Sequence, residues 1–495
     1  MSTNKDGVIQ RDMGDNVMAN NDTVPLLQRN EHHRRPSSDP FLYIVVAVSL
    51  LAPISAGYTI GYSSPAIPQL KNDTILDDNS ASWFGSLLNV GAIFGGPVAG
   101  FLIGSIGRKA TLMACAVPFA VGWALIASVP YVWGLYLGRV LTGFATGMTT
   151  LACPIYIAEM ASPDNRGFLG SSFQLFITLG ILLVYTLGVY LSYVWLAIIG
   201  AIFACMLSCF MLPMPDTPSY WLIKHDRHRA LAVLHKVRNV NVDVDLECRE
   251  IEATLDNSDN NVSLSEFGQR HLFMPLLISL ALMFFQQFSG INTVMFYTVT
   301  IFQSTGSSID ANTATIVIGA VQVVATLVSV MLMDLVGRKV LLITAGVLMA
   351  ISSTTFGLYY FLTKDEISPT TPSGLEDILL GNAKSDLGWL SLSSMVIYII
   401  GFSLGLGPIP WLIMSEIFPS KARGLASSIA TAFNWTCSFI ITKEFLDLEN
   451  LLHKEGVFWM YAVVCVLEII FVILFVPETK GKSLEEIEDY FRRRE

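Results

Sequence analysis

Long runs without a single charged residue limit most strongly what this chain can fold into. They lie at 41–70, 79–107, 110–138, 140–158, 167–215, 272–309, 311–333, 340–363, 387–415 and 424–442. In a lipid bilayer the backbone has no water to bond to, so such runs form helices of about 20 residues. The run 167–215 holds two spans that turn near Ser192, and a last run, 456–477, is broken only by Glu468. We therefore expect twelve membrane-spanning helices.

The composition supports a membrane protein and excludes several other classes. Charged residues make up 14% of the 495, against about 25% in soluble domains, and the mean hydropathy is +0.55. The net charge of −10 disfavours nucleic acid as a partner, because phosphate binding needs clustered Lys and Arg. The seven cysteines show no disulfide or zinc spacing. We expect an all-α membrane protein with no bound metal.

The distribution of Lys and Arg between the loops predicts the orientation of the chain. Of the 30 basic residues, 24 fall on the side that holds both termini, five fall on the other side, and Arg139 lies within a span. The positive-inside rule then places both termini in the cytosol. The predicted divisions are a disordered tail (1–40), a six-helix bundle (41–213), cytosolic linker helices (214–271), a second six-helix bundle (272–476) and a cytosolic tail (477–495).

The two predicted bundles repeat each other in three sequence cassettes. Gly-Arg-Lys follows span 2 at 107–109 and recurs after span 8 at 337–339. Glu and Arg stand seven residues apart after span 4 and again after span 10. Pro-Asp-Thr at 215–217 recurs as Pro-Glu-Thr at 477–479. Parallel six-helix repeats are typical of transporters that rock about a site between two halves.

The charges in these cassettes form a candidate cytosolic latch. If their ion pairs bridge the two halves, they hold the inner mouth shut and must break for it to open. The alternative is that the basic residues only anchor the loops at the membrane face. The repetition of the whole set favours the latch. Its members are Arg108, Glu159, Arg166, Asp334, Arg338, Glu416 and Arg423.

Several strings along nearly the whole chain resemble the sugar porters of the major facilitator superfamily. They are GRK, GRVLTG (138–143), PDTPSYWL (215–222), QQFSGIN (286–292), GPIPW (407–411) and PETKGKSLEEIE (477–488). The region 409–490 is most similar to the class III facilitative glucose transporters, and arthropod trehalose transporters are the nearest alternative. The resemblance implies the major facilitator fold and transport of a neutral sugar, without a cofactor and without enzymatic activity.

Amide side chains inside apolar spans are the candidate substrate ligands. Polar groups are costly there, and amides both donate and accept hydrogen bonds, which suits a neutral polyhydroxylated ligand. On one unbroken helix Gln286 and Asn292 would point 240° apart, so Ser289-Gly290 is a candidate break, and the glycines and prolines at 405–410 are another. The alternative is that such amides join helix to helix.

The resemblance assigns roles to particular residues of this sequence. It implies sugar contacts for Gln174, Gln286, Gln287, Asn292, Gln322, Trp411 and Asn434. It also places Phe296 and Tyr297 at an outer gate. Ser403 and Ser438 depart from the residues that many glucose transporters have, Glu and Asn respectively, which leaves the preferred sugar open.

Thr59 stands where proton-coupled relatives have an Asp in span 1. Thr does not titrate, so the sequence favours facilitated diffusion of a hexose such as glucose. A trehalose facilitator, a proton-coupled symporter and a non-transporting sugar sensor remain as alternatives. For Glu468 three interpretations stay open: it reaches toward the membrane surface, pairs with a partner, or titrates.

Two short motifs bear on sorting and modification. Asp22, Leu26 and Leu27 match an acidic dileucine signal for adaptor proteins, which predicts plasma membrane or endosomal–lysosomal membranes as the location. Asn72 begins a glycosylation sequon in a short outer loop.

Overall fold

The computed structural model is almost wholly helical in the residues it describes. These are 39–129, 131–162, 165–240, 242–256, 267, 269–305, 309–363, 387–418, 420–480, 482, 486–487 and 490–491. Within these ranges, 12 helical segments are long and apolar enough to cross a membrane. The prediction of an all-α, twelve-span membrane protein is confirmed.

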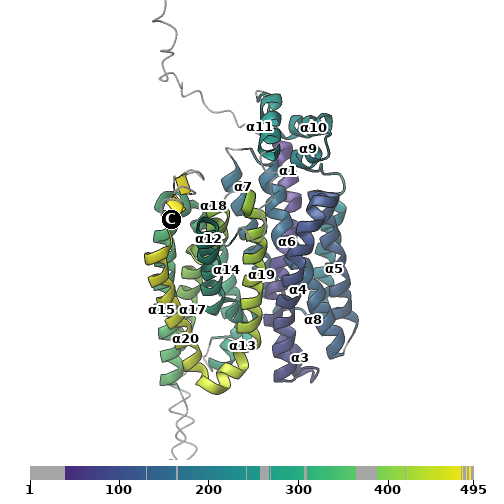
Figure 1. Ribbon diagram of the computed structural model, residues 1–495. Helices are drawn as coiled ribbons and strands as arrows, with labels where there is room; N and C mark the ends of the chain where they lie inside the picture. Colours follow the sequence, from purple (N-terminus) through teal and green to yellow (C-terminus); the bar gives the residue numbers. More distant parts are fainter. Residues whose placement is uncertain are drawn as a thin grey trace, which may run out of the picture.

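The first six spans form one half of the bundle, the N half, drawn in purple to blue in Figure 1. Its helices are α1 (Pro40–Ser49), α2 (Leu51–Gly61), α3 (Ser63–Asn72), α4 (Asp78–Ile106), α5 (Arg108–Ser128), α6 (Val132–Met160), α7 (Arg166–Gly188) and α8 (Tyr193–Met211). Because α1, α2 and α3 follow one another almost without interruption, they make up a single span.

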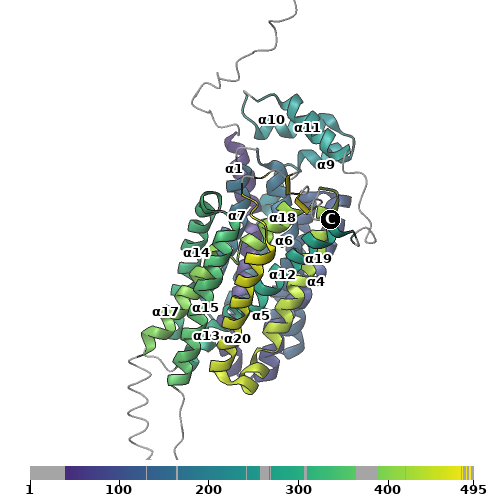
Figure 2. The ribbon, with the colours of Figure 1, turned by 60° about the vertical axis from the view of Figure 1, so that its left-hand side comes forward.

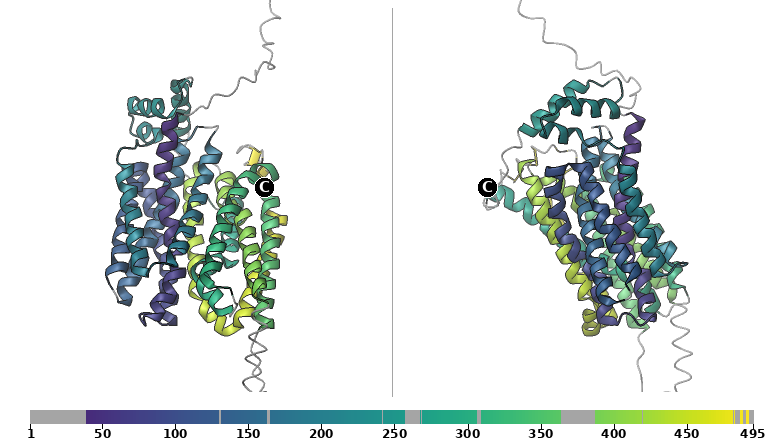
Figure 3. Two further views of the ribbon diagram at one scale, coloured as in Figure 1. Left: turned by 180° about the vertical axis from the view of Figure 1, so that it is seen from behind. Right: turned by 90° about the vertical axis from the view of Figure 1, so that its right-hand side faces the viewer.

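The last six spans form the second half, the C half, drawn in green to yellow beside the first (Figure 1). Its helices are α12 (Arg270–Phe288), α13 (Ile291–Thr305), α14 (Ala311–Val336), α15 (Arg338–Leu362), α17 (Gly388–Leu404), α18 (Ile409–Ile417), α19 (Ser420–Lys443) and α20 (Phe445–Phe475). Figure 3 shows the two halves side by side from behind. Two spans of this half are built from two helices each, α12 with α13 and α17 with α18.

Three short helices connect the halves at one end of the bundle. They are α9 (Pro218–Ile223), α10 (Arg227–Val237) and α11 (Val244–Asp256), and Figure 2 shows them lying together above the membrane-spanning helices. We call this end the linker end and the opposite end the distal end. Arg238 ties the linker to the N half, because its guanidinium donates to the carbonyl of Met160 at 2.7 Å and pairs with Glu247 at 2.7 Å.

Glycines allow the helices of the N half to approach closely, as at Gly91 and Gly95 in α4. A Cβ at Gly91 would lie 2.0 Å from the Val140 carbonyl oxygen, and one at Gly143 in α6 would lie 2.0 Å from that of Leu88. Side chains at these positions would therefore force α4 and α6 apart. Gly104, which continues the same spacing, has no atom within 4 Å of its Cβ position, so the close approach ends before it.

Large aromatic side chains are exposed at the distal end of several spans. Trp133, Trp195 and Trp389 lie in the first turns of α6, α8 and α17; their exposed fractions are 81%, 60% and 63%. Trp is enriched at the level of the lipid headgroups, where its ring is half in water and half in lipid. The exposed rings mark the distal membrane interface.

Candidate functional site

Four amide side chains meet at the point where α12 gives way to α13. Gln286 Nε2 donates to the carbonyls of Leu406 and Gly407 at 2.7 and 3.0 Å. Asn434 Nδ2 donates to Gln286 Oε1 at 2.8 Å, and Gln287 Nε2 donates to Asn434 Oδ1 at 3.1 Å. Asn292 Nδ2 donates to Gln287 Oε1 at 2.7 Å. We call Gln286, Gln287, Asn292 and Asn434 the amide cluster.

Breaks in two spans bring this cluster together, as the sequence predicted. Helix α12 ends at Phe288, and Gly290 takes a φ of +94°, which favours glycine. A Cβ at Gly290 would lie 2.4 Å from the Tyr461 ring. The second break, between α17 and α18, frees the carbonyls of Leu406 and Gly407 to accept from Gln286. Both predicted interruptions are confirmed.

Ser438 is a member of the site that sequence reasoning noticed only as a departure from a pattern. Its hydroxyl accepts a hydrogen bond from Asn292 Nδ2 at 2.6 Å. Ser438 lies one helical turn from Asn434 on α19, and that spacing was a usable signal. Met283, whose sulfur accepts from Asn434 Nδ2 at 3.3 Å, carried no such signal.

Three other predicted sugar ligands lie outside this network. Gln322 in α14 is buried, and its Oε1 has no hydrogen-bond partner among the described residues. Trp411 in α18 is partly buried against the main hydrophobic core, and Gln174 in α7 is half-buried. Within the described ranges, no hydrogen bond joins these three side chains to the amide cluster.

Hydrogen bonds between the two halves close the distal end. Asn89 Nδ2 on α4 donates to Thr442 Oγ1 on α19 at 3.0 Å. About two helical turns closer to the distal end of α4, the Ser82 hydroxyl donates to the Lys443 carbonyl at 2.7 Å. The Tyr185 hydroxyl on α7 donates to the Met295 carbonyl on α13, also at 2.7 Å. We call these three hydrogen bonds the distal seal. Each of them joins two uncharged groups.

The predicted gate residues, Phe296 and Tyr297, lie on α13 between the amide cluster and the distal end. Phe296 is fully buried and Tyr297 is 1% exposed. The Tyr297 ring stacks on Phe445 with centroids 5.2 Å apart, and its hydroxyl lies 3.2 Å from the Cβ position of Gly85 on the N half. Tyr297 also interrupts the helix, with φ −117° and ψ 17°. The two side chains thus contact the other half from a kink.

At the linker end, each Gly-Arg-Lys turn is held by a carboxylate from the third cassette of its own half. Asp216 accepts from the backbone N–H groups of Arg108 and Lys109, both at 3.2 Å. Glu478 accepts from those of Arg338 and Lys339, both at 3.0 Å. The turns take a φ of +95° at residue 107 and +102° at residue 337. A carboxylate here satisfies free N–H groups at a helix N-terminus.

The two carboxylates are equivalent in position and opposite in the direction of their pKa shifts. Burial raises the pKa of Asp216 above its ordinary value, and its hydrogen bonds only partly offset this. For Glu478, burial also acts to raise the pKa, but hydrogen bonds from the backbone N–H groups of Lys480, Lys339 and Arg338 outweigh it, so the pKa is lowered. The repeated Pro-Asp-Thr and Pro-Glu-Thr strings were the sequence signal for this pair.

The ion pairs of the candidate latch lie within the halves. Arg108 pairs with Glu159 at 2.8 Å in the N half, and Arg338 pairs with Glu416 at 3.1 Å in the C half. Each joins the start of one helix to the end of another, α5 to α6 and α15 to α18. For the remaining predicted members the backbone is helical and the side chains lie outside what the structure describes; they are Arg166, Asp334 and Arg423.

Arg139 in α6 is a fully buried cation that lies against the boundary between α2 and α3. Its guanidinium donates to the Thr59 carbonyl at 3.0 Å, the Ser63 hydroxyl at 2.7 Å and the Phe84 carbonyl at 3.2 Å. All three acceptors are uncharged. Arg139 therefore joins α6 to α2, α3 and α4 through neutral oxygens.

Glu468 is fully buried in α20 and packs against α15. Its Oε2 lies 2.2 Å from the position that a Cβ at Gly346 would occupy. Neither carboxyl oxygen has a hydrogen-bond partner among the described residues. Burial disfavours the interpretation that the side chain reaches toward the membrane surface, and no ion pair joins it to another residue in the described part of the chain.

The sorting motif Asp22, Leu26 and Leu27 lies outside the described residues. Asn72 is exposed at the end of α3, at the distal end of the bundle.

Twelve spans in two halves, with broken helices that gather uncharged polar groups, define a membrane carrier of the major facilitator type. The chain belongs to the Sugar (and other) transporter family, whose profile matches residues 43–491. Membership of a transporter family agrees with the expectation that the protein is not an enzyme.

Similar proteins include two curated relatives and a solved carrier. The chain is 41% identical to the facilitated trehalose transporter Tret1 of Aedes aegypti, covering 92% of this chain and 56% of that protein. It is 38% identical to the facilitated glucose transporter member 8 of solute carrier family 2 of Mus musculus, covering 96% and 98%. The proton:xylose symporter XylE, solved with 6-bromo-6-deoxy-D-glucose, matches with a TM-score of 0.74 and 26% identity, covering 91% and 99%.

Proposed function

We propose that the protein carries a neutral sugar, a hexose such as glucose, across a membrane by facilitated diffusion. The observation that carries this proposal is the amide cluster, which offers donors and acceptors but no charge at the breaks of two spans. Such a set matches the hydroxyl groups of a sugar and gives an ion no compensating charge. The glucose transport named for the mouse relative supports the hexose.

Trehalose is the second candidate substrate. The Aedes relative is named for it, and Ser438 lies against Asn292 with only a short hydroxyl side chain. A short side chain at this point leaves more room beside the cluster than an amide would. A disaccharide needs that room, whereas a hexose does not.

The contacts of Arg139 support diffusion without proton coupling. A proton-coupled carrier needs a group that gains and loses a proton near its substrate, and XylE is named as a proton symporter. Among the described residues, the hydrogen-bond acceptors of Arg139 are the neutral oxygens of Thr59, Ser63 and Phe84. Neutral oxygens stay unprotonated throughout the physiological pH range, so this contact gives protons no means to drive the cycle.

We further propose that the linker end faces the cytosol, as the excess of Lys and Arg on that side favours. The distal seal then closes the outer side. The dileucine motif at Asp22 supports delivery by adaptor proteins to the plasma membrane or to endosomal–lysosomal membranes. Exposed Asn72 is the proposed glycosylation site on the outer side.

In this proposal the ion pairs of the candidate latch do not bridge the two halves. Because Arg108–Glu159 and Arg338–Glu416 each lie within one half, they hold neighbouring helix ends together. Each half then moves as a unit while the interface between the halves opens and closes. A non-transporting sugar sensor would need the same binding site but no such alternation.

Uptake of radiolabelled glucose into proteoliposomes tests the proposal, with fructose and trehalose as competitors. We expect saturable uptake that glucose competes with and that a Gln287→Ala variant loses. Saturable uptake of trehalose but not of glucose would mean that the substrate is the disaccharide and not the hexose. If no sugar shows saturable uptake but sugar binding is retained, the protein is a non-transporting sugar sensor. An imposed proton gradient is expected to leave the uptake rate unchanged.

A further inference from the structure

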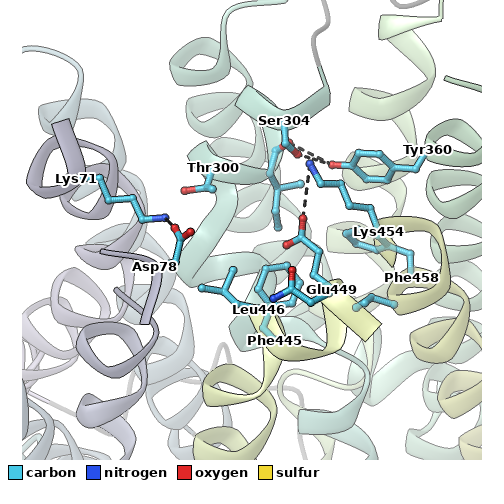
Figure 4. A pocket seen from close by; sticks show the side chains of 13 residues that line it. Lys71, Asp78, Thr300, Ser304, Tyr360, Phe445, Leu446, Glu449, Lys454 and Phe458 are labelled. Atoms are coloured by element: carbon cyan, nitrogen blue, oxygen red, sulfur yellow. Dashed lines mark hydrogen bonds and ion pairs between the residues drawn. The ribbon is translucent and has the colours of Figure 1, made fainter. Parts of the chain in front are cut away.

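A cavity of about 260 Å³ lies at the distal end, where the two halves meet. One wall comes from the N half, with Lys71 at the end of α3 and Asp78 at the start of α4. The other walls come from α13, α15 and α20 of the C half, and Figure 4 shows their side chains turned toward the same space. We call this cavity the distal vestibule. Nothing in the amide cluster contributes to it.

The charges that line the vestibule are balanced in two pairs. Lys71 Nζ lies 2.5 Å from Asp78 Oδ1, and Lys454 Nζ lies 3.6 Å from Glu449 Oε1. A lone anion or cation therefore meets no net charge of the opposite sign. The longer pair exceeds hydrogen-bond length, so the Glu449 carboxylate and the Lys454 ammonium can still bond to a ligand.

Neutral hydrogen-bonding groups and aromatic rings complete the lining. The Ser304 and Tyr360 hydroxyls are 2.8 Å apart, and the Thr300 hydroxyl and Asn450 amide form no hydrogen bond within the described part of the chain. Phe445 and Phe458 add ring surface. Hydroxyls, an amide and a balanced charge beside ring faces suit a ligand with many hydroxyl groups and an apolar face.

Phe445 separates the vestibule from the interior of the bundle. It lines the cavity and stacks on the buried Tyr297 ring, with centroids 5.2 Å apart. A ligand in the vestibule would thus lie on the distal side of the gate, apart from the amide cluster beyond it.

We propose that the distal vestibule is a second binding site for a neutral sugar, separate from the amide cluster. This inference rests on the proposed function for its ligand class. Because the walls belong to both halves, the site is complete only while the distal end is closed. A sugar bound there stabilises the closed arrangement, since a ligand shifts an equilibrium toward the state it binds better.

Equilibrium binding of radiolabelled D-glucose to the purified full-length protein tests this site, with radiolabelled trehalose in parallel. Asn450→Trp fills the vestibule. Leu451→Trp is the matched control, because it places the same indole ring at the next residue, which is 74% exposed and does not line the cavity. Gln287→Ala removes the amide cluster as a site. Ser304→Trp fills the same cavity from α13 and replaces Asn450→Trp should that variant unfold in a thermal melt.

We expect the wild type and Leu451→Trp to bind two sugars per chain at saturation, and Asn450→Trp to lose half of that binding. Gln287→Ala should keep the half that Asn450→Trp loses, and the double variant should bind none. Equal binding by Asn450→Trp and Leu451→Trp, or complete loss of binding in Gln287→Ala, would overturn the second site. The proposed function fails separately, through absence of saturable uptake by the wild type in proteoliposomes.

Discussion

Removing one hydrogen bond of the distal seal should shift the protein toward a state that is open at the distal end. Thr442 Oγ1 accepts from Asn89 Nδ2 of the other half at 3.0 Å, and both residues are fully buried or nearly so. Thr442→Val keeps the shape of the side chain and removes the acceptor. Asn89 Oδ1 already has no partner among the described residues, so the variant leaves the whole amide without one.

The size of the shift follows from the cost of that unpaired amide. A buried polar group that loses its partner costs about 1–3 kcal/mol. Water reaches the amide once the distal end opens, so the cost falls on the closed state alone. A difference of this size changes an equilibrium about 5–150-fold, and we expect the open population to rise within that range.

A second threonine on the same helix provides the control. Thr442 also donates to the carbonyl of Ser438 in its own helix, at 2.6 Å, and valine loses that bond as well. Thr436 donates to the Ala432 carbonyl in the same way, at 2.8 Å, but takes no part in the distal seal. Thr436→Val therefore reports what the loss of the internal bond does by itself.

Distances between spin labels on the two halves measure the opening. Labels at Asp73 and Leu451, both exposed near the distal end, should separate when the seal opens. Cys205 and Cys209 are exposed and are replaced by serine first. Equal populations of the longer distance in Thr442→Val and Thr436→Val would refute the argument that this bond holds the distal end closed.

Three further predictions concern packing, coupling and pH. Gly143→Ala should abolish folded protein in a membrane-extraction assay, because its Cβ meets a backbone oxygen of α4 at 2.0 Å, whereas Gly104→Ala, in open space, should not. Thr59→Asp should make uptake depend on pH, since it puts a titratable group beside Arg139; a flat pH profile would contradict this. The lowered pKa of Glu478 predicts that its stabilising effect is lost as pH falls through that pKa, so the melting temperature of Glu478→Gln should depend less on acid pH than that of the wild type.

The sequence predicted the fold and the breaks near the site because both are encoded locally. Charge-free runs count the spans, and Ser289-Gly290 lies where a helix would otherwise point its amides apart. Gly290 has the positive φ that the break requires. The boundary between α2 and α3 at Tyr62 was not predicted, because Tyr62 keeps helical angles, φ −56° and ψ −33°. A helix boundary at which φ and ψ stay helical requires no particular residue type, so the sequence carries no signal for it.

Contacts between distant segments were predicted less well. The cassettes identified Arg108 and Glu159 as charged groups at helix ends, but spacing along the chain does not say which half supplies a partner. Sequence patterns do not predict the distal vestibule, because Lys71, Thr300 and Asn450 come from three separate segments. Only the packing of the two halves brings such residues to one cavity.

The two ends of the bundle use different interactions, and the difference suits a carrier that alternates. At the linker end, Arg108–Glu159 and Arg338–Glu416 pair charges inside each half. Breaking a partly buried pair leaves an uncompensated charge, so these contacts persist while the halves move. At the distal end the halves meet through neutral bonds such as Asn89–Thr442, each worth about 0.5–1.5 kcal/mol net. Such bonds exchange for water at low cost, so the interface between the halves opens before either half deforms.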